Sequence, residues 1–172
     1  MAEIAGTVGM SKRTLYANYD DKNALFKAAV NRAVARYTIP IDVLKNAQKD
    51  DLEKTLTEVA RIRIDNISTP TGIKLQRILA TQSYRFPEMF NAAFDIGAGP
   101  TIDFLAELFE QNNASGVTDV GKPRQAAIAF LSLVVGGPAR LIIAGGQQIS
   151  AEEMESRVKF SIELFLNGVR KR

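Results

Sequence analysis

The chain has 172 residues, of which 46% are hydrophobic and 24% charged, as is typical of a globular protein with a buried core. It contains neither cysteine nor histidine. This excludes disulfide bonds, catalytic triads of the Ser-His or Cys-His kind and ordinary zinc sites. No metal or other cofactor is expected, and an enzyme would have to rely on carboxylate or lysine chemistry.

The net charge of +3 is unevenly placed along the chain. Residues 1–37 carry six Lys and Arg side chains against three Asp and Glu side chains, whereas the remaining residues carry sixteen of each sign. Binding to phosphate requires a local cationic excess of this kind. A solvated helix face would explain the same three charges, so charge alone leaves both interpretations open.

The start of the chain has the pattern of a helix-turn-helix. Ile4, Ala5 and Val8 share one face of a short helix, and the small Ala5 would let a second helix cross closely. Residues 9–11 have the length of the turn in this motif, because glycine can take a left-handed conformation and serine can cap the next helix. The pattern points to DNA.

A second helix is predicted after Ser11. Leu15 and Tyr19 lie four residues apart and form its inward side. The rise from Ser11 to Tyr19 is about 12 Å, close to the width of the major groove of B-DNA. Side chains that suit phosphates and base edges occupy the other positions: Lys12, Arg13, Thr14, Tyr16 and Asn18.

The most specific features of this segment are, in chain order, Ile4-Ala5, Gly9 to Ser11, Thr14-Leu15-Tyr16, Tyr19, Lys22 and Leu25-Phe26. This pattern resembles the DNA-binding motif of the TetR family of bacterial transcriptional repressors. The resemblance covers only about the first thirty residues, because members of such a family share architecture far more than sequence. The residues predicted to contact DNA are Ser11, Lys12, Arg13, Thr14, Tyr16, Asn18, Tyr19 and Lys22.

The resemblance also implies a further helix before the motif, whereas here the motif begins close to Met1. Two explanations are open: the protein lacks that helix, or the residues that form it lie upstream of this sequence. We expect the second, because a motif without its bracing helix would expose Ile4, Val8, Met10 and Leu15 to water. Each large side chain left unburied costs roughly 1.5–3 kcal/mol. A form that truly lacks the helix is not expected to bind DNA.

A third helix is predicted over residues 22–37, with Asp20 or Asp21 as its cap. It is expected to break at residues 38–40, because proline restricts the residue before it and lacks an amide donor. We expect this helix to link two domains. These are a helix-turn-helix domain of residues 1–37, incomplete without its leading helix, and a helical effector-binding and dimerisation domain of residues 38–172.

The second domain is predicted to be entirely helical. Apolar periodicity and turn residues predict helices at 51–67, at 72–86, and from Pro87 to Phe109 with a kink at 97–100. Further helices are predicted at 124–135, 139–144 and 151–169, the last with a capping box at its start. No strand pattern competes, so the expected fold class is all-α.

The apolar stretch at residues 126–144 raises the question of a membrane span. Gly136-Gly137-Pro138 breaks it and Arg140 places a charge in it, which favours a buried helix pair over a bilayer span. Charges interrupt the apolar residues of the first thirty positions, so no secretory signal is visible. A cytoplasmic protein without membrane contact is expected.

The last two long helices are predicted to form a homodimer. The first is apolar on most sides and carries small residues that would permit close approach. A core helix of a monomer is the alternative. The resemblance favours the dimer, since TetR-like proteins pair through a four-helix bundle of such helices. The expected interface residues are Phe130, Val134, Met154, Val158, Ile162 and Phe165.

Aromatic and polar side chains gather in the middle of the sequence. An aromatic-lined pocket with a few polar groups is typical of small-molecule sites, although core packing would explain the same aromatics. The segment 97–100 lacks the Lys-Ser/Thr ending and preceding strand of a phosphate loop, so a helix kink is preferred there. The predicted effector site consists of Gln82, Tyr84, Arg85, Phe90, Phe94 and Phe104.

These features together predict a one-component transcriptional regulator. We expect a repressor that binds operator DNA as a homodimer and is released by a small-molecule effector. Two alternatives remain open. One is a dimeric helical interaction protein without DNA binding, and the other is an all-α enzyme that uses carboxylate or lysine chemistry.

Overall fold

The computed structural model describes residues 1–145 and 150–170, and within them the chain is all-α. A single isolated bridge, between Thr118 and Arg170, is the only extended pairing in these ranges. The all-α prediction is confirmed. The helices are α1 Ala2–Thr7, α2 Lys12–Asn18, α3 Lys22–Tyr37, α4 Ile41–Asn46, α5 Leu52–Ser68, α6 Pro70–Gln82, α7 Pro87–Ala114, α8 Pro123–Val134, α9 Gly136–Ala144 and α10 Ala151–Val169.

Side-chain caps fix where most of the predicted helices begin. Ser11, Asp21 and Ser150 each accept a hydrogen bond from the amide three residues ahead, at 3.1, 2.7 and 3.1 Å. Asp51 and Thr69 do the same for α5 and α6. Each cap satisfies an amide that the first helical turn leaves without a partner.

Several elements differ from the sequence-based expectation. Helix α6 ends at Gln82 rather than near residue 86, α7 extends to Ala114, and α9 begins at Gly136, where a break is predicted. The short helix α4 was not predicted, since its six residues are too few to show a period, yet its Leu44 is fully buried.

Helix α7 includes residues 97–100, the segment where a kink is predicted, and Pro100 lies inside it. Pro100 cannot donate to the Ile96 carbonyl, and Thr38 Oγ1 donates to that oxygen instead, at 3.0 Å. The acceptor that Pro100 leaves free is therefore satisfied.

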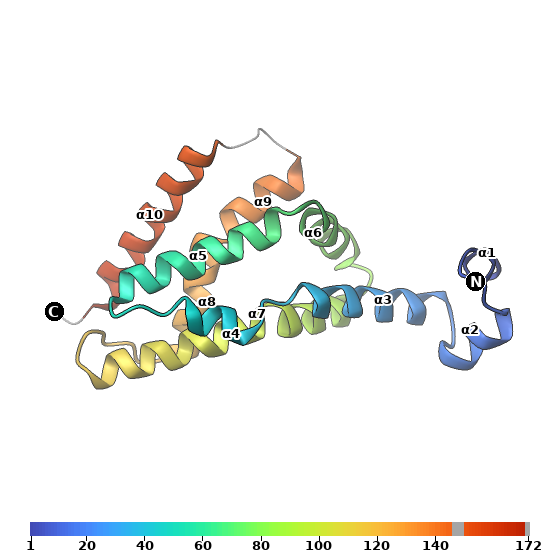
Figure 1. Cartoon of the computed structure of the whole chain (residues 1–172), viewed down its shortest axis with the longest axis horizontal. Helices are drawn as coiled ribbons and strands as arrows, with labels where there is room; N and C mark the ends of the chain where they lie inside the picture. Colours follow the sequence, from blue (N-terminus) through green and yellow to red (C-terminus); the bar gives the residue numbers. More distant parts are fainter. Residues whose placement is uncertain (146–149, 171–172) are drawn as a thin grey trace.

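The helices form an elongated molecule, with α1 and α2 at one end and α10 near the other (Figure 1). We call α1 and α2 the head, and α4–α10 the body. Helix α3 joins them, because it runs from the head into the body and packs along α7. The head therefore stands apart from the body and is positioned by one helix.

Two separate hydrophobic clusters hold the body together. The main core joins α4, α5, the second half of α7, α8 and α10, with the rings of Phe109 and Phe130 5.5 and 5.2 Å from that of Phe165. The second cluster joins α3, α6 and the start of α7 through Val30, Val34 and Phe86, among others. Helix α3 thus shares a core with the body.

Over the residues that the structure describes, no helix is both long and apolar enough to cross a bilayer.

Candidate functional site

The head is a compact helix-turn-helix with very little core of its own. Ala5 and Leu15 are its buried apolar side chains, where α1 meets α2. Gly9 has φ +66°, the left-handed conformation expected of the turn. Val8 and Met10 are 55% and 43% exposed, whereas Ile4 is half-buried and Leu15 is buried.

The residues predicted to contact DNA lie together on α2 and at the start of α3. All of them are exposed except Tyr19, which is half-buried. Ser11 Oγ is 2.8 Å from Thr14 Oγ1, and Asn18 Nδ2 donates to the Thr14 carbonyl at 2.8 Å. These contacts order the polar face of α2. Lys12, Arg13 and Tyr16 extend into solvent from α2, and Lys22 does so from the first position of α3.

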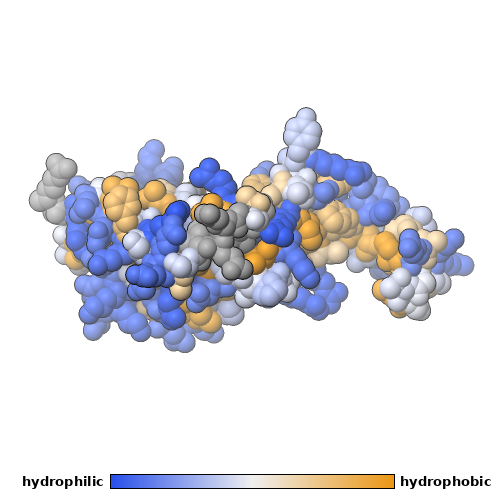
Figure 2. All heavy atoms as spheres, turned by 90° about the horizontal axis from the view of Figure 1, so that it is seen from above, coloured by the Kyte–Doolittle hydropathy of each residue, from blue (hydrophilic) through white to orange (hydrophobic). Residues whose placement is uncertain are grey.

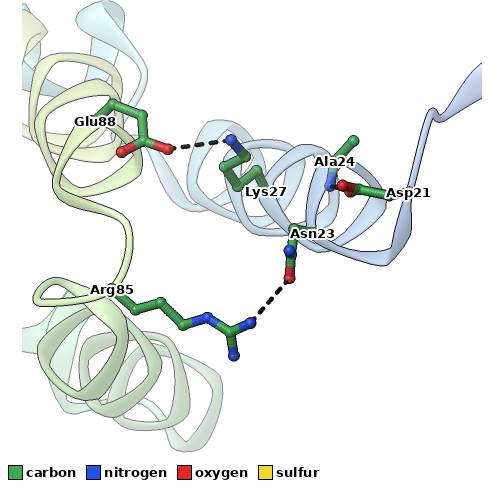
Figure 3. A network of polar contacts seen from close by, with 6 residues as sticks. All are labelled: Asp21, Asn23, Ala24, Lys27, Arg85 and Glu88. Atoms are coloured by element: carbon green, nitrogen blue, oxygen red, sulfur yellow. Dashed lines mark hydrogen bonds and ion pairs between the residues drawn. The ribbon is translucent and has the colours of Figure 1, made fainter.

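The start of α3 is tied to the corner between α6 and α7 (Figure 3). Lys27 Nζ lies 3.1 Å from Glu88 Oε1, and Arg85 Nη2 donates to Asn23 Oδ1 at 3.5 Å. The Phe86 ring contacts both cations, with Lys27 Nζ 5.7 Å and the Arg85 guanidinium carbon 5.0 Å from its centroid. A displacement of this corner would therefore reach the helix that carries the head.

A cavity of about 260 Å³ lies at the boundary between the two hydrophobic clusters. Its lining includes Val34, Leu75 and Leu79 of the second cluster together with Ala98 and Ile102 of the main core. Its size is near the lower end of the range for small-molecule pockets. A ligand here would touch α3, α5, α6, α7 and α8 at once.

Few polar side chains reach this mostly apolar cavity. Arg63 of α5 is only 9% exposed, and its Nη1 donates to the Gly97 carbonyl at 3.0 Å. Burial lowers the pKa of the Arg63 guanidinium, which nevertheless stays charged at neutral pH. Asn66 Nδ2 donates to the Tyr37 carbonyl at 3.1 Å. Hydrogen bonds with Thr71 and Thr69 lower the pKa of the Tyr37 hydroxyl.

Only two of the predicted effector residues line this cavity, namely Phe90 and Phe94. Phe104 is buried in the main core, and Tyr84 is fully exposed. Gln82 and Arg85 lie at the corner between α6 and α7, where Arg85 contacts α3. Aromatic residues close in sequence therefore lie in the core, at the surface and in the cavity wall. Tyr84 belongs to the turn between α6 and α7, and different residues of α7 face different directions.

The polar lining residues from α5 were missed by the sequence-based prediction. Arg63 follows Leu56 and Val59 at helical spacing, on the same buried stripe of α5. A cation on an otherwise apolar stripe is the signal that could have indicated the site.

The residues predicted to form the dimer interface require a correction. Phe130, Val134, Val158, Ile162 and Phe165 are buried in the protomer's own core, and Met154 packs partly buried against it. The five buried residues belong to the inward faces of α8 and α10 and leave almost no surface for a partner, whereas Met154 is half-buried. The large exposed apolar side chains of these helices are Ile128, Leu133, Phe160 and Leu164.

Known proteins were compared with the chain by sequence and by structure. Residues 54–168 match the family described as the AefR-like transcriptional repressor, C-terminal domain. The solved flavonoid-responsive regulator FrrA is 30% identical, with a TM-score of 0.78 over 100% of this chain and 87% of that one. A comparison with curated proteins gives no match.

Two further solved structures share the fold. A TetR-family regulator from Mesorhizobium loti is 24% identical, with a TM-score of 0.78 over 99% of this chain and 86% of that one. One from Rhodococcus sp. is 19% identical, with a TM-score of 0.66 over 96% and 86%. Regulators of this kind bind DNA rather than catalyse reactions. The chain belongs to the TetR family of transcriptional regulators.

Proposed function

We propose that the protein is a repressor that binds operator DNA as a homodimer and is released by an effector that binds in the 260 Å³ cavity. One observation carries this proposal: α3, which positions the head, also forms part of the cavity wall through Val34 and Tyr37. A ligand that prefers one position of α3 would therefore change the position of the head. In this proposal residues 1–37 are the DNA-binding domain and residues 38–172 bind effector and partner.

DNA contact is assigned to the polar face of α2. Lys12 and Arg13 are exposed at its start, where side chains of a recognition helix reach base edges. Tyr16, Tyr19 and Lys22 are assigned to phosphates, together with Ser11, Thr14 and Asn18. Arginine can pair with guanine through two hydrogen bonds, whereas a phosphate contact carries no sequence information.

The coupling from cavity to head is assigned to the contacts at both ends of α3. At its end, Asn66 bonds the Tyr37 carbonyl and Thr38 bonds the Ile96 carbonyl beside the cavity. At its start, the contacts of Lys27 and Asn23 with the corner after α6 fix its direction. An effector need only favour the arrangement of these contacts that does not fit DNA.

The homodimer is assigned to the outward faces of α8 and α10. Phe160 and Leu164, one turn apart on α10, are 65% and 53% exposed, and Leu133 on α8 is 42% exposed. Apolar colour gathers over α10 among hydrophilic side chains (Figure 2). Large exposed apolar side chains on the two helices through which TetR-like proteins pair support a second copy of this chain as the partner.

We assign the effector to one chemical class, the compounds with aromatic rings. The cavity walls are apolar, with Phe90 and Phe94 among them. FrrA, which is 30% identical, responds to flavonoids. A flat ring system with one or two polar groups fits the mostly apolar lining.

Binding to DNA can be tested with a duplex selected by the wild-type protein from a random pool, beside a scrambled duplex. Affinities are measured across salt for Arg13→Ala, Lys22→Ala and, as a control in the body, the exposed Lys74→Ala. Arg13→Ala should lose about 1–3 kcal/mol on the selected duplex only, and Lys22→Ala should weaken both duplexes and lower the salt slope by about one. Absence of salt-dependent duplex binding would instead favour a helical interaction protein.

Release by effector is tested by adding aromatic compounds to the preformed complex. Since coupling is reciprocal, each compound that binds the cavity must bind the DNA complex less tightly, typically by 1–3 kcal/mol. Equal affinity for free protein and complex would contradict the proposed release.

A further inference from the structure

The cavity contains a buried charge that the protein itself leaves unpaired. Arg63 is the charged residue among the described lining residues, which include no Asp or Glu. None of the ion pairs found within the described ranges involves it. Arg61, two positions earlier on α5, is exposed and pairs with Glu58 at 2.6 Å. The two arginines therefore have opposite environments on one helix.

The hydrogen bonds of Arg63 leave one edge of its guanidinium free. Nη1 donates to the Gly97 carbonyl at 3.0 Å. Nε is buried and has no partner in the described part of the chain. Nε and Nη2 form the opposite edge of the planar group, and neither atom has a hydrogen-bond partner among the described residues.

An unpaired buried charge is unfavourable because the group has lost its water. Burial also lowers the pKa of Arg63, which reflects the same desolvation. The guanidinium cannot relieve this cost by losing its proton at neutral pH. A ligand anion can relieve it, since pairing in a low-dielectric site is stronger than in water.

We propose that the effector is an organic anion whose aromatic body fills the apolar cavity and whose carboxylate or phenolate pairs with Arg63. This inference rests on the proposed function and deepens it by assigning the charge of the ligand. The Gly97 bond is compatible with it, because Nη1 is not needed for the pair. Asn66 and Gln76 also line the cavity and can bond further oxygens of the ring system.

The position of Arg63 also places the anion next to the helix that carries the head. Gly97, whose carbonyl Arg63 holds, lies against α3 so closely that a Cβ there would be 3.2 Å from Val34 Cγ1. A charge pair formed at this point acts where α3, α5 and α7 meet.

Matched pairs of acid and amide test the charge directly. Benzoate, 2-naphthoate and anthracene-2-carboxylate are titrated calorimetrically against the full chain beside benzamide, 2-naphthamide and anthracene-2-carboxamide. Within a pair the rings are identical and only the charge differs. We expect at least one acid to bind on the order of tenfold tighter than its amide. If no acid binds better than its amide, the proposal is overturned, and no variant is needed for that result.

Three variants test whether Arg63 causes the preference for the acid over the amide. Arg63→Gln should abolish the preference for the acid, and Arg63→Lys should retain part of it, because a charge remains without the fork. Arg61→Gln is the matched control and should behave as wild type. Thermal unfolding of each variant checks that the body is folded. A preference for the acid that survives Arg63→Gln in folded protein would overturn the assignment.

Displacement of DNA separates this inference from the proposed function. If neutral amides release the operator as well as the acids do, the anion proposal fails and release by effector stands. If the acids bind through Arg63 but leave operator affinity unchanged, the anion site stands and the proposed release fails.

Discussion

The head and the body are stabilised by different interactions. In the head, Ala5 and Leu15 supply the buried apolar contact between two short helices, and a cap at Ser11 and a left-handed Gly9 set the angle. In the body, large side chains such as Phe109 and Phe130 are completely buried among several helices. The head therefore depends on local geometry and the body on packing. Substitutions in one should leave the other largely intact.

The largest expected effects come from the two faces of α10. Phe165→Glu would bury a carboxylate between the rings of Phe109 and Phe130, at a cost of several kcal/mol that unfolds the body. Phe160→Glu, on the exposed face of the same helix, should leave the protomer folded and split the dimer. Circular dichroism and sedimentation distinguish these outcomes. A folded dimer of Phe160→Glu would place the interface elsewhere.

Leu15→Ala tests the other side of the comparison. It removes the large buried side chain of the head, and a buried leucine truncated to alanine typically costs about 2–5 kcal/mol. The head should open while the body melts at its usual temperature, so operator affinity falls without a change in the main unfolding transition. Val8→Ala, at an exposed position, is the control. Equal lowering of both transitions would mean that the head and the body unfold as one unit.

Local chemistry explains what could be predicted from the sequence. Ser11, Asp21 and Ser150 act as caps because a short side-chain oxygen next to the first turn suffices, whatever lies farther away. The direction of α10 could not be predicted in this way. Phe160 and Leu164 alternate with Ile162 and Phe165, so both faces are apolar and only packing decides which is buried.

The cavity illustrates the same limit. Arg63 and Phe94 lie on different helices and are brought together only by the crossing of α5 and α7. Sequence proximity instead favoured Tyr84, which is fully exposed, and Phe104, which is core. The bond from Thr38 to the Ile96 carbonyl, which satisfies the acceptor that Pro100 leaves free, likewise joins residues that are distant in sequence.

Replacing either of two helical glycines with alanine should change the free energy of unfolding moderately, in opposite directions. A Cβ at Gly72 would lie 2.6 Å from the Asn66 carbonyl oxygen, so Gly72→Ala must push α6 away from α5. Such overpacking typically costs about 1–3 kcal/mol. Gly99 has open space, and Gly99→Ala should stabilise α7 by about 0.5–1 kcal/mol. Denaturant unfolding measures both, and a stabilised Gly72→Ala would contradict the close approach of α5 and α6.

The smallest expected effect lies at the contact between α3 and α7. The pKa of the Glu88 carboxyl is lowered by a hydrogen bond from the backbone amide of Glu88 itself and by the Lys27 ammonium. A carboxylate with a lowered pKa contributes stability above its unfolded pKa, which is about 4.3, and loses it as the pH falls through the folded value. Both side chains are substantially exposed, so water and salt weaken the pair.

Glu88→Gln should therefore lower the melting temperature slightly at pH 7, and the difference from wild type should vanish as the pH approaches 3. Added salt should shrink the difference at pH 7 as well, because it screens exposed charges. Glu110→Gln is a control on the same helix, about 33 Å along its axis from Glu88. A difference that grows as the pH falls would have the wrong sign for a carboxylate stabilised in the folded state. A loss of operator affinity larger than the loss of stability would show that this weak contact matters mainly because it sets the direction of α3.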